Sequence, residues 1–170
     1  MSDKPRSGAD MASFTLPAVK GGEVKIGGPG RWQLALVYRG KHCPICAGQL
    51  KELNEKLGEF TDAGVEVVAF STDPQEKAES FSNDLGVDFP IGYGFSIDKA
   101  RELGLYISEP RNDQETDRPF SEPGLFVTNP DGKIQLVDIS NSPFTRPGLD
   151  WVLKGINIIK EKNYPIRGTA

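Results

Sequence analysis

The chain contains the sequence Trp32-Gln33-Leu34-Ala35-Leu36-Val37-Tyr38-Arg39-Gly40-Lys41-His42-Cys43-Pro44-Ile45-Cys46. Its first seven residues are almost continuously apolar, which is typical of a strand covered on both faces of a sheet. Its last five residues hold both cysteines of the chain and its only histidine. Two thiols in a C-x-x-C spacing directly after a strand indicate a redox pair or metal ligands rather than a structural cross-link.

A helix is predicted directly after the strand and the cysteines. Apolar residues recur at steps of four, three, four and three, which is one face of a helix; they are Cys46, Leu50, Leu53, Leu57 and Phe60. Pro44 suits the first helical position, so Cys43 would be the N-cap residue. Free backbone N–H groups and the helix dipole stabilise a thiolate there. Cys46 would face the same side, at a spacing that suits a reversible disulfide.

The remaining pattern alternates strands and helices. Short strands are predicted at 14–17, 23–26, 65–71 and 89–91, and helices from Asp73 as cap to 85, from 98 to 105 and from about 149 to 159. A hairpin with a Pro-Asp-Gly turn is predicted at 124–139. Strands joined by helices imply an α/β fold with a central sheet flanked by helices. The hairpin adds antiparallel strands at one edge, which makes the sheet mixed, and a C-terminal helix follows it.

The length of 170 residues fits one domain with a substantial core. We expect this domain at residues 14–165, after a polar, disordered N-terminal segment at 1–13. Residues 108–123 contain three prolines, five acids and two arginines. A long, net acidic loop is therefore expected there, and such loops are usually functional or mobile.

Composition narrows the partners and the compartment. The net charge is −4 and there is no basic tract, so nucleic acid is not an expected partner. Apolar runs of about five residues are too short to span a membrane, and the N-terminus lacks the apolar core of a signal peptide. We therefore expect a cytoplasmic, reducing setting and no membrane.

Two other interpretations of the cysteines were weighed. They could be buried apolar residues by chance, since free cysteine is often buried. A zinc site normally takes four ligands, and only a Cys-Cys-His-carboxylate set could be assembled here. We expect neither a metal nor a cofactor. His42 could lower the pKa of Cys43 as an imidazolium, or it could simply be a wall of the cleft.

These residues resemble the thioredoxin-like superfamily, and within it the peroxiredoxin-like AhpC/TSA (redoxin) family, from Phe14 to about Lys160. Residues 36–50 are similar to the family's active-site segment, in the form with Tyr-Arg-Gly before Cys-Pro-x-Cys. Three further stretches are similar to the family's first strand, its next core strand and an arginine-containing segment before the last helix; they are 14–17, 67–71 and 142–147.

The resemblance implies a thioredoxin-like fold and thiol redox chemistry, with a hydroperoxide or a protein disulfide as oxidant. It implies that Pro123, before the Gly124–Thr128 strand, is a cis-proline next to the disulfide. Arg118 and Arg146 become candidates for holding a thiolate or peroxide, although either could be a solvated charge. Arg39 could be a supporting residue or a charge at the strand end.

The sequence departs from the peroxide-binding motif P-x-x-x-T/S-x-x-C of typical peroxiredoxins. If Cys46 is the reactive residue, Arg39 replaces the proline and Cys43 replaces the threonine. If Cys43 is the reactive residue, Leu36 and Gly40 stand at these positions. The motif is broken in both registers, so the Cys43–Cys46 pair is closer to a thioredoxin-type redox motif.

The sequence therefore predicts a thiol-disulfide oxidoreductase or antioxidant protein that cycles a Cys43–Cys46 disulfide. Cys43 is expected to be the exposed nucleophile and Cys46 the more buried resolving thiol. The expected partners are a peroxide or disulfide substrate and an external thiol such as thioredoxin or glutathione; a second copy of the chain, as a homodimer, is a further candidate.

Two alternatives stay open at this point. One is a hydroperoxide reductase with Cys46 as the peroxidatic sulfur and Cys43 as its resolver. The other is a non-catalytic redox-sensing or adaptor domain whose interaction surface is the loop at 108–123.

Overall fold

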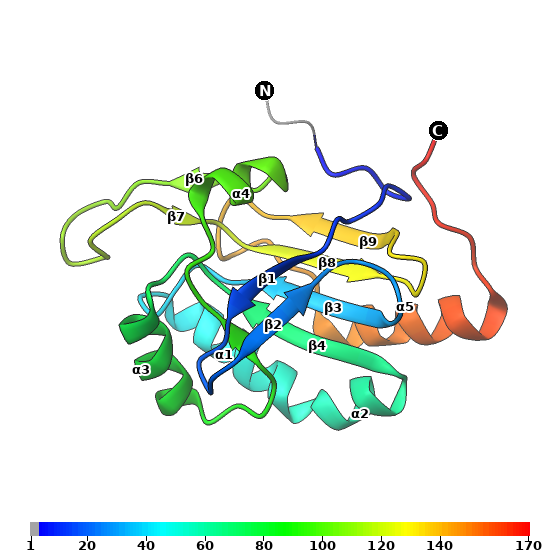
Figure 1. Cartoon of the computed structure of the whole chain (residues 1–170), viewed down its shortest axis with the longest axis horizontal. Helices are drawn as coiled ribbons and strands as arrows, with labels where there is room; N and C mark the ends of the chain where they lie inside the picture. The colour runs from blue at the N-terminus through cyan, green and yellow to red at the C-terminus, as the bar shows by residue number, and fades with distance from the viewer. Residues whose placement is uncertain (1–3) are drawn as a thin grey trace.

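Five strands form the central sheet of the computed structural model, which describes residues 4–170. β3 (Trp32–Val37) pairs in parallel with β4 (Val65–Phe70), and β4 pairs in parallel with β5 (Ile91–Gly92). On its other side β3 pairs antiparallel with β8 (Gly124–Thr128), whose hairpin partner is β9 (Ile134–Ile139). The order is therefore β5-β4-β3-β8-β9 (Figure 1), and the prediction of a mixed sheet with the hairpin at one edge is confirmed.

Helices and a small hairpin cover the two faces of the sheet. The helices are α1 (Pro44–Glu55), α2 (Leu57–Asp62), α3 (Gln75–Leu85), α4 (Ile97–Glu102) and α5 (Leu149–Lys162). Leu34 and Leu36 of β3 face a core cluster shared with α1, α2, α3 and α5, and both cysteines belong to it. Ala35 and Val37 face the opposite cluster, which includes α4. This alternation follows the period of two of a strand.

Two short antiparallel hairpins lie outside the central sheet. β1 (Phe14–Pro17) pairs with β2 (Glu23–Ile26) and covers the face that carries α4. β6 (Ile107–Ser108) pairs with β7 (Phe120–Ser121) and closes the base of the expected long loop, which leaves 109–119 as the loop proper. In Figure 1 this β6–β7 hairpin extends beyond the sheet, above the level of α3.

The N-terminal segment is a correction, because from Gly8 onward it is bound to the sheet edge and is not disordered. The Gly8 N–H donates to the Ile134 carbonyl at 2.8 Å, and the Met11 N–H donates to the Gly132 carbonyl at 3.0 Å. The Met11 side chain is buried. β9 is an edge strand with free backbone groups, and the segment takes them up. Residues 1–3 of that expectation lie outside the described residues.

The start of α3 is a second correction. Pro74 is its N-cap residue, and Asp73 does not cap it. The Asp73 carboxylate instead accepts a hydrogen bond from the Lys41 backbone N–H at 2.7 Å. Gly40 permits this approach, because its φ is +142° and a Cβ there would lie 2.8 Å from Asp73 Oδ1. Asp73 therefore fixes the turn that leads into the cysteines.

The predicted helix after the cysteines is divided into α1 and α2 at Lys56. Its apolar face is nevertheless continuous in the core, with Leu50, Leu53 and Phe60 fully buried. Among the described residues, none of the helices has the length and apolar character needed to cross a membrane.

Candidate active site

Cys43 is the N-cap residue of α1, as its spacing from Pro44 predicts. Its backbone is extended, with φ −107° and ψ 100°, and its Sγ accepts a hydrogen bond from the Cys46 N–H at 3.2 Å. Both cysteines are free thiols. The helix start thus offers a backbone donor to one sulfur and places the second sulfur three residues further on.

Neither sulfur is exposed, so the prediction of an exposed Cys43 is wrong. Cys43 is 1% exposed and Cys46 is 0% exposed. The His42 ring packs edge-on against Phe120 of β7, with the ring centroids 4.5 Å apart. Phe120 is itself buried. The β6–β7 hairpin therefore helps to enclose the neighbourhood of Cys43, a contact that the sequence does not indicate.

The two thiols differ strongly in protonation. The hydrogen bond from the Cys46 side chain lowers the pKa of Cys43 to about 6, and the Cys46 N–H and Arg39 lower it further against the opposing effect of burial. The same hydrogen bond, together with burial, raises the pKa of Cys46. At pH 7 Cys43 is therefore the thiolate, and Cys46 is the thiol that donates to it.

His42 is not an imidazolium, which corrects the more active of its two expected roles. Burial lowers the pKa of His42 to about 4, and the nearby charge of Arg39 lowers it further. Neither ring nitrogen has a hydrogen-bond partner among the described residues. His42 is a neutral wall of the site beside Cys43.

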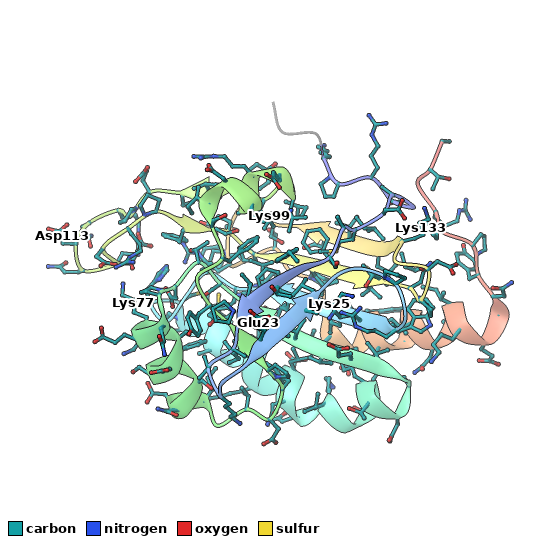
Figure 2. The ribbon with its side chains drawn as sticks, in the orientation of Figure 1. Glu23, Lys25, Lys77, Lys99, Asp113 and Lys133 are labelled. Carbon is teal, nitrogen blue, oxygen red and sulfur yellow. The ribbon has the colours of Figure 1, made fainter. Side chains whose placement is uncertain are left out.

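His42 also lines a pocket of about 440 Å³. It is lined by Lys41, Lys77 and the loop at 113–117. Lys77 lies on α3, and Asp113 lies near the outer end of the loop (Figure 2). Lys77 Nζ binds Asp117 at 2.5 Å and Thr116 at 3.1 Å, so the loop is anchored to α3 across this pocket.

Arg39 reaches from the end of β3 to the β6–β7 hairpin. Its Nε and Nη2 donate to the two carboxylate oxygens of Glu122 at 2.9 and 3.4 Å, and Glu115 lies 3.7 Å from Nη2. Its guanidinium also stacks over Phe120, 4.8 Å from the ring centroid. Arg39 is thus fixed in place, and it lowers the pKa of Cys43.

Arg146 reaches the second sulfur. Its Nη1 donates to Cys46 Sγ at 3.5 Å and also to Gln49, and its Nε donates to the Pro143 carbonyl at 3.2 Å. Nη2 is buried and has no partner among the described residues. The structure therefore brings Arg146, 100 positions away in sequence, to Cys46.

Two of the predicted residues do not join this arrangement as expected. Arg118 pairs with the adjacent Asp117 at 2.8 Å and is exposed. Pro123 follows a trans peptide bond, since the described residues contain no cis bond, so the cis prediction is wrong. The Pro123 carbonyl accepts the Ser140 N–H at 3.0 Å, which closes the end of the β8–β9 ladder.

The sequence did not single out Glu122, Phe120 or Gln49. Glu122 and Phe120 stand in a segment that reads as an acidic loop, and their contacts to Arg39 span about 80 positions. The one local feature that could have marked Glu122 as a functional residue is its position between Ser121 and Pro123, directly before a buried strand. Among residues 4–170, no cluster of three or more His, Cys, Asp or Glu side chains is placed to hold a metal ion.

The fold and the C-x-x-C pair at the start of α1 define a thioredoxin-like protein. Residues 7–137 match the model of the AhpC/TSA family. Because this match covers most of the chain, the protein belongs to that family. Peroxiredoxin 6 of Arenicola marina, in a cysteine-to-serine form, is a structural neighbour with a TM-score of 0.77 and 21% identity, over 92% of this chain and 74% of that chain. This likeness concerns the fold alone.

Two sequence relatives carry names from redox chemistry. A putative peroxiredoxin of Mycobacterium tuberculosis is 34% identical over 85 residues, which are 49% of this chain and 54% of that protein. The thiol-disulfide oxidoreductase ResA of Halalkalibacterium halodurans is 25% identical over 87 residues, 51% of this chain and 49% of that protein. The similar region thus spans about half the length of these relatives.

Proposed function

We propose that the protein is a thiol-disulfide oxidoreductase with antioxidant activity that cycles between a Cys43–Cys46 dithiol and a disulfide. The observation that carries the proposal is the unequal pair at the start of α1. Cys43 Sγ accepts the Cys46 N–H at 3.2 Å and has a pKa of about 6, while the pKa of Cys46 is raised. The names of the two sequence relatives support the same chemistry.

In the first half-reaction the Cys43 thiolate attacks an oxygen of a hydroperoxide. The O–O bond breaks, the departing oxygen takes up a proton as an alcohol or water, and Cys43 becomes a sulfenic acid. Cys46 then loses its proton and attacks Cys43 Sγ; the S–O bond breaks, water leaves and the disulfide forms. With a disulfide as oxidant, Cys43 forms a mixed disulfide and Cys46 releases the second thiol in the same way.

The burial of the sulfurs favours a small oxidant. With Cys43 1% exposed, a hydroperoxide needs a much smaller opening than the disulfide of a folded protein. An external dithiol such as thioredoxin, or two molecules of glutathione, would return the pair to the dithiol by exchange. Such a cycle requires a reducing compartment, so we place the protein in the cytoplasm as part of the proposal, and a homodimer stays a further expectation.

A second candidate function is a hydroperoxide reductase with Cys46 as the peroxidatic sulfur. It is favoured by Arg146, whose Nη1 lies 3.5 Å from Cys46 Sγ and whose buried Nη2 has no partner among the described residues. A guanidinium in this position suits a developing anion at Cys46. Cys43 would then resolve the sulfenic acid, with the same balance of atoms.

Serine variants distinguish the two candidates. If Cys43 is the nucleophile, Cys43→Ser loses the fast reaction with hydrogen peroxide in stopped flow, while Cys46→Ser keeps one stoichiometric reaction. Mass spectrometry should then find the sulfenic acid, trapped with dimedone, on Cys43. The opposite pattern supports Cys46 as the peroxidatic sulfur. A wild-type protein no faster than a free thiol, with hydrogen peroxide and with a small disulfide, would falsify the enzymatic proposal.

A further inference from the structure

Glu122 is a buried carboxylate for which neither proposed reaction assigns a role. It is 3% exposed and lies at the end of β7, directly before Pro123. Its side chain is fixed from two directions, by the Ser108 hydroxyl, which donates to Oε1 at 2.7 Å, and by Arg39. Burying a carboxylate carries a large desolvation penalty. The burial of Glu122 therefore needs a reason, which its partner Arg39 provides.

The partner of Glu122 is Arg39, whose guanidinium lies 4.8 Å from the centre of the Phe120 ring that also contacts His42, the residue before Cys43, and whose charge lowers the pKa of Cys43. Glu122 engages the Nε and Nη2 side of the guanidinium, and neither Glu122 nor Glu115 accepts a hydrogen bond from Nη1. A guanidinium held by two parallel hydrogen bonds has a fixed plane and direction. The Arg39 side chain is 15% exposed and lies over Phe120, so its other faces are also enclosed. The ion pair with Glu122 therefore also fixes the direction of the Arg39 N–H groups that do not bond to Glu122.

We propose that Glu122 is a positioning residue for the reactive thiolate, because it holds the Arg39 guanidinium in the orientation in which that group stabilises Cys43. The inference rests on the proposed function and deepens it, since it adds a third residue to the machinery of the first half-reaction. Glu122 touches neither sulfur and acts through Arg39. Ser108, through its hydrogen bond to Oε1, restricts Glu122 in turn.

The direction in which the Cys43 pKa changes when Glu122 is replaced distinguishes a positioning role from a direct charge effect of Glu122 on Cys43. A carboxylate near a thiolate repels it, so removing the charge of Glu122 would by itself lower the pKa of Cys43. If Glu122 instead orients Arg39, its removal weakens the stabilisation of the thiolate and raises that pKa. A purely structural ion pair between β3 and the hairpin would change stability and leave the pKa in place.

The experiment titrates the Cys43 thiolate by its absorbance at 240 nm in a Cys46→Ser background, where it is the one remaining thiol. Glu122→Gln should raise the midpoint by about one pH unit, since an ion pair typically shifts a pKa by one to three units. Glu115→Gln is the matched control, because it removes the same charge from the longer contact to Arg39, at 3.7 Å. Its midpoint should stay in place or fall.

A double-mutant cycle tests whether Glu122 acts through Arg39. In an Arg39→Gln background, adding Glu122→Gln should leave the midpoint unchanged or lower it, because the group that Glu122 orients is absent and only the direct repulsion between Glu122 and the thiolate is removed. The same rise with and without Arg39 overturns the proposal. So does a Glu122→Gln midpoint that is unchanged or lowered in the Arg39-containing protein.

Ser108→Ala keeps the proposal testable if Glu122→Gln does not fold, as judged by circular dichroism. It removes one anchor of Glu122 without changing any charge, so a smaller rise of the midpoint supports positioning and an unchanged midpoint contradicts it. The titration needs no substrate. Absence of turnover in the two-cysteine protein would overturn the proposed function and leave the result for Glu122 standing.

Discussion

At the scale of single residues, Cys43 and Cys46 are equally inaccessible and differ in charge. Burial raises the pKa of both thiols, so it cannot distinguish them. The difference comes from the hydrogen bond between the two residues: Cys43 Sγ accepts from the Cys46 side chain and backbone, so the proton stays on Cys46 although Arg146 Nη1 also lies 3.5 Å from Cys46 Sγ. In the proposed mechanism, this asymmetry makes Cys43 the attacking sulfur and Cys46 the resolving sulfur. The assignment does not require Cys43 to be exposed to solvent.

The pH dependence of the first chemical step should follow the Cys43 thiolate. Since its pKa is lowered to about 6, the thiolate is lost as the pH falls through 6 and is nearly complete at pH 7. The rate at which hydrogen peroxide oxidises the fully reduced wild-type protein in stopped flow should therefore be half-maximal near pH 6 and level above pH 7. A midpoint near 8.5, the ordinary value for a thiol, would contradict the hydrogen-bonded arrangement.

His42 should contribute packing and no charge to this profile. Its pKa is lowered to about 4 by burial, so it is neutral wherever the enzyme has its thiolate. His42→Phe retains an aromatic ring against Phe120 and should leave the midpoint within about 0.3 units, because no imidazolium is lost. A rise of about one unit in the same assay would restore the imidazolium role that the sequence suggested.

At the scale of elements, the local patterns were predicted well and the contacts between distant elements were not. The apolar run of β3, the N-cap at Cys43 and the buried face of α1 each depend on spacings within one segment. The Arg39–Glu122 pair spans 83 positions and the Arg146–Cys46 contact spans 100. Arg146 is predicted from the family resemblance. Glu122 could not be predicted, because it reaches Arg39 through the pairing of β6 with β7, and no hydrophobic periodicity in the sequence indicates that pairing.

The turn between β3 and α1 should depend on glycine at position 40. Gly40→Ala would force a side chain into φ +142° and 2.8 Å from Asp73 Oδ1, so it should lower the free energy of unfolding by about 1–3 kcal/mol. Gly48→Ala is the matched control in α1, where no atom lies within 4 Å of a new Cβ. It should raise stability by about 0.5–1 kcal/mol in urea titrations. Equal effects of the two variants would contradict the strained turn.

At the scale of the whole molecule, the sheet has one edge at β9, and Gly8 and Thr169 lie close to each other near it. Gly8 bonds to Ile134, and a Cβ at Gly8 would come within 3.1 Å of the Thr169 side chain. Residues before and after the expected domain range of 14–165 therefore contact each other and the sheet at this edge. Polar composition suggested disorder at the N-terminus, but composition cannot reveal that an unpaired strand edge accepts the segment.

Met11 gives the sharpest test of the contact between the N-terminal segment and the sheet. Its side chain is 3% exposed and packs in the same core cluster as Ile26 and Ile134, so Met11→Ala should lower the free energy of unfolding by about 2–3 kcal/mol. Asp10→Ala is the control from the adjacent position: it removes an exposed ion pair with Lys133 and should cost less than about 1 kcal/mol. Urea titrations of both variants decide the point, because a disordered segment would make the two changes equally small. A loss at Met11 alone would show that the segment before β1 stabilises the sheet on which β3 and the cysteines are built.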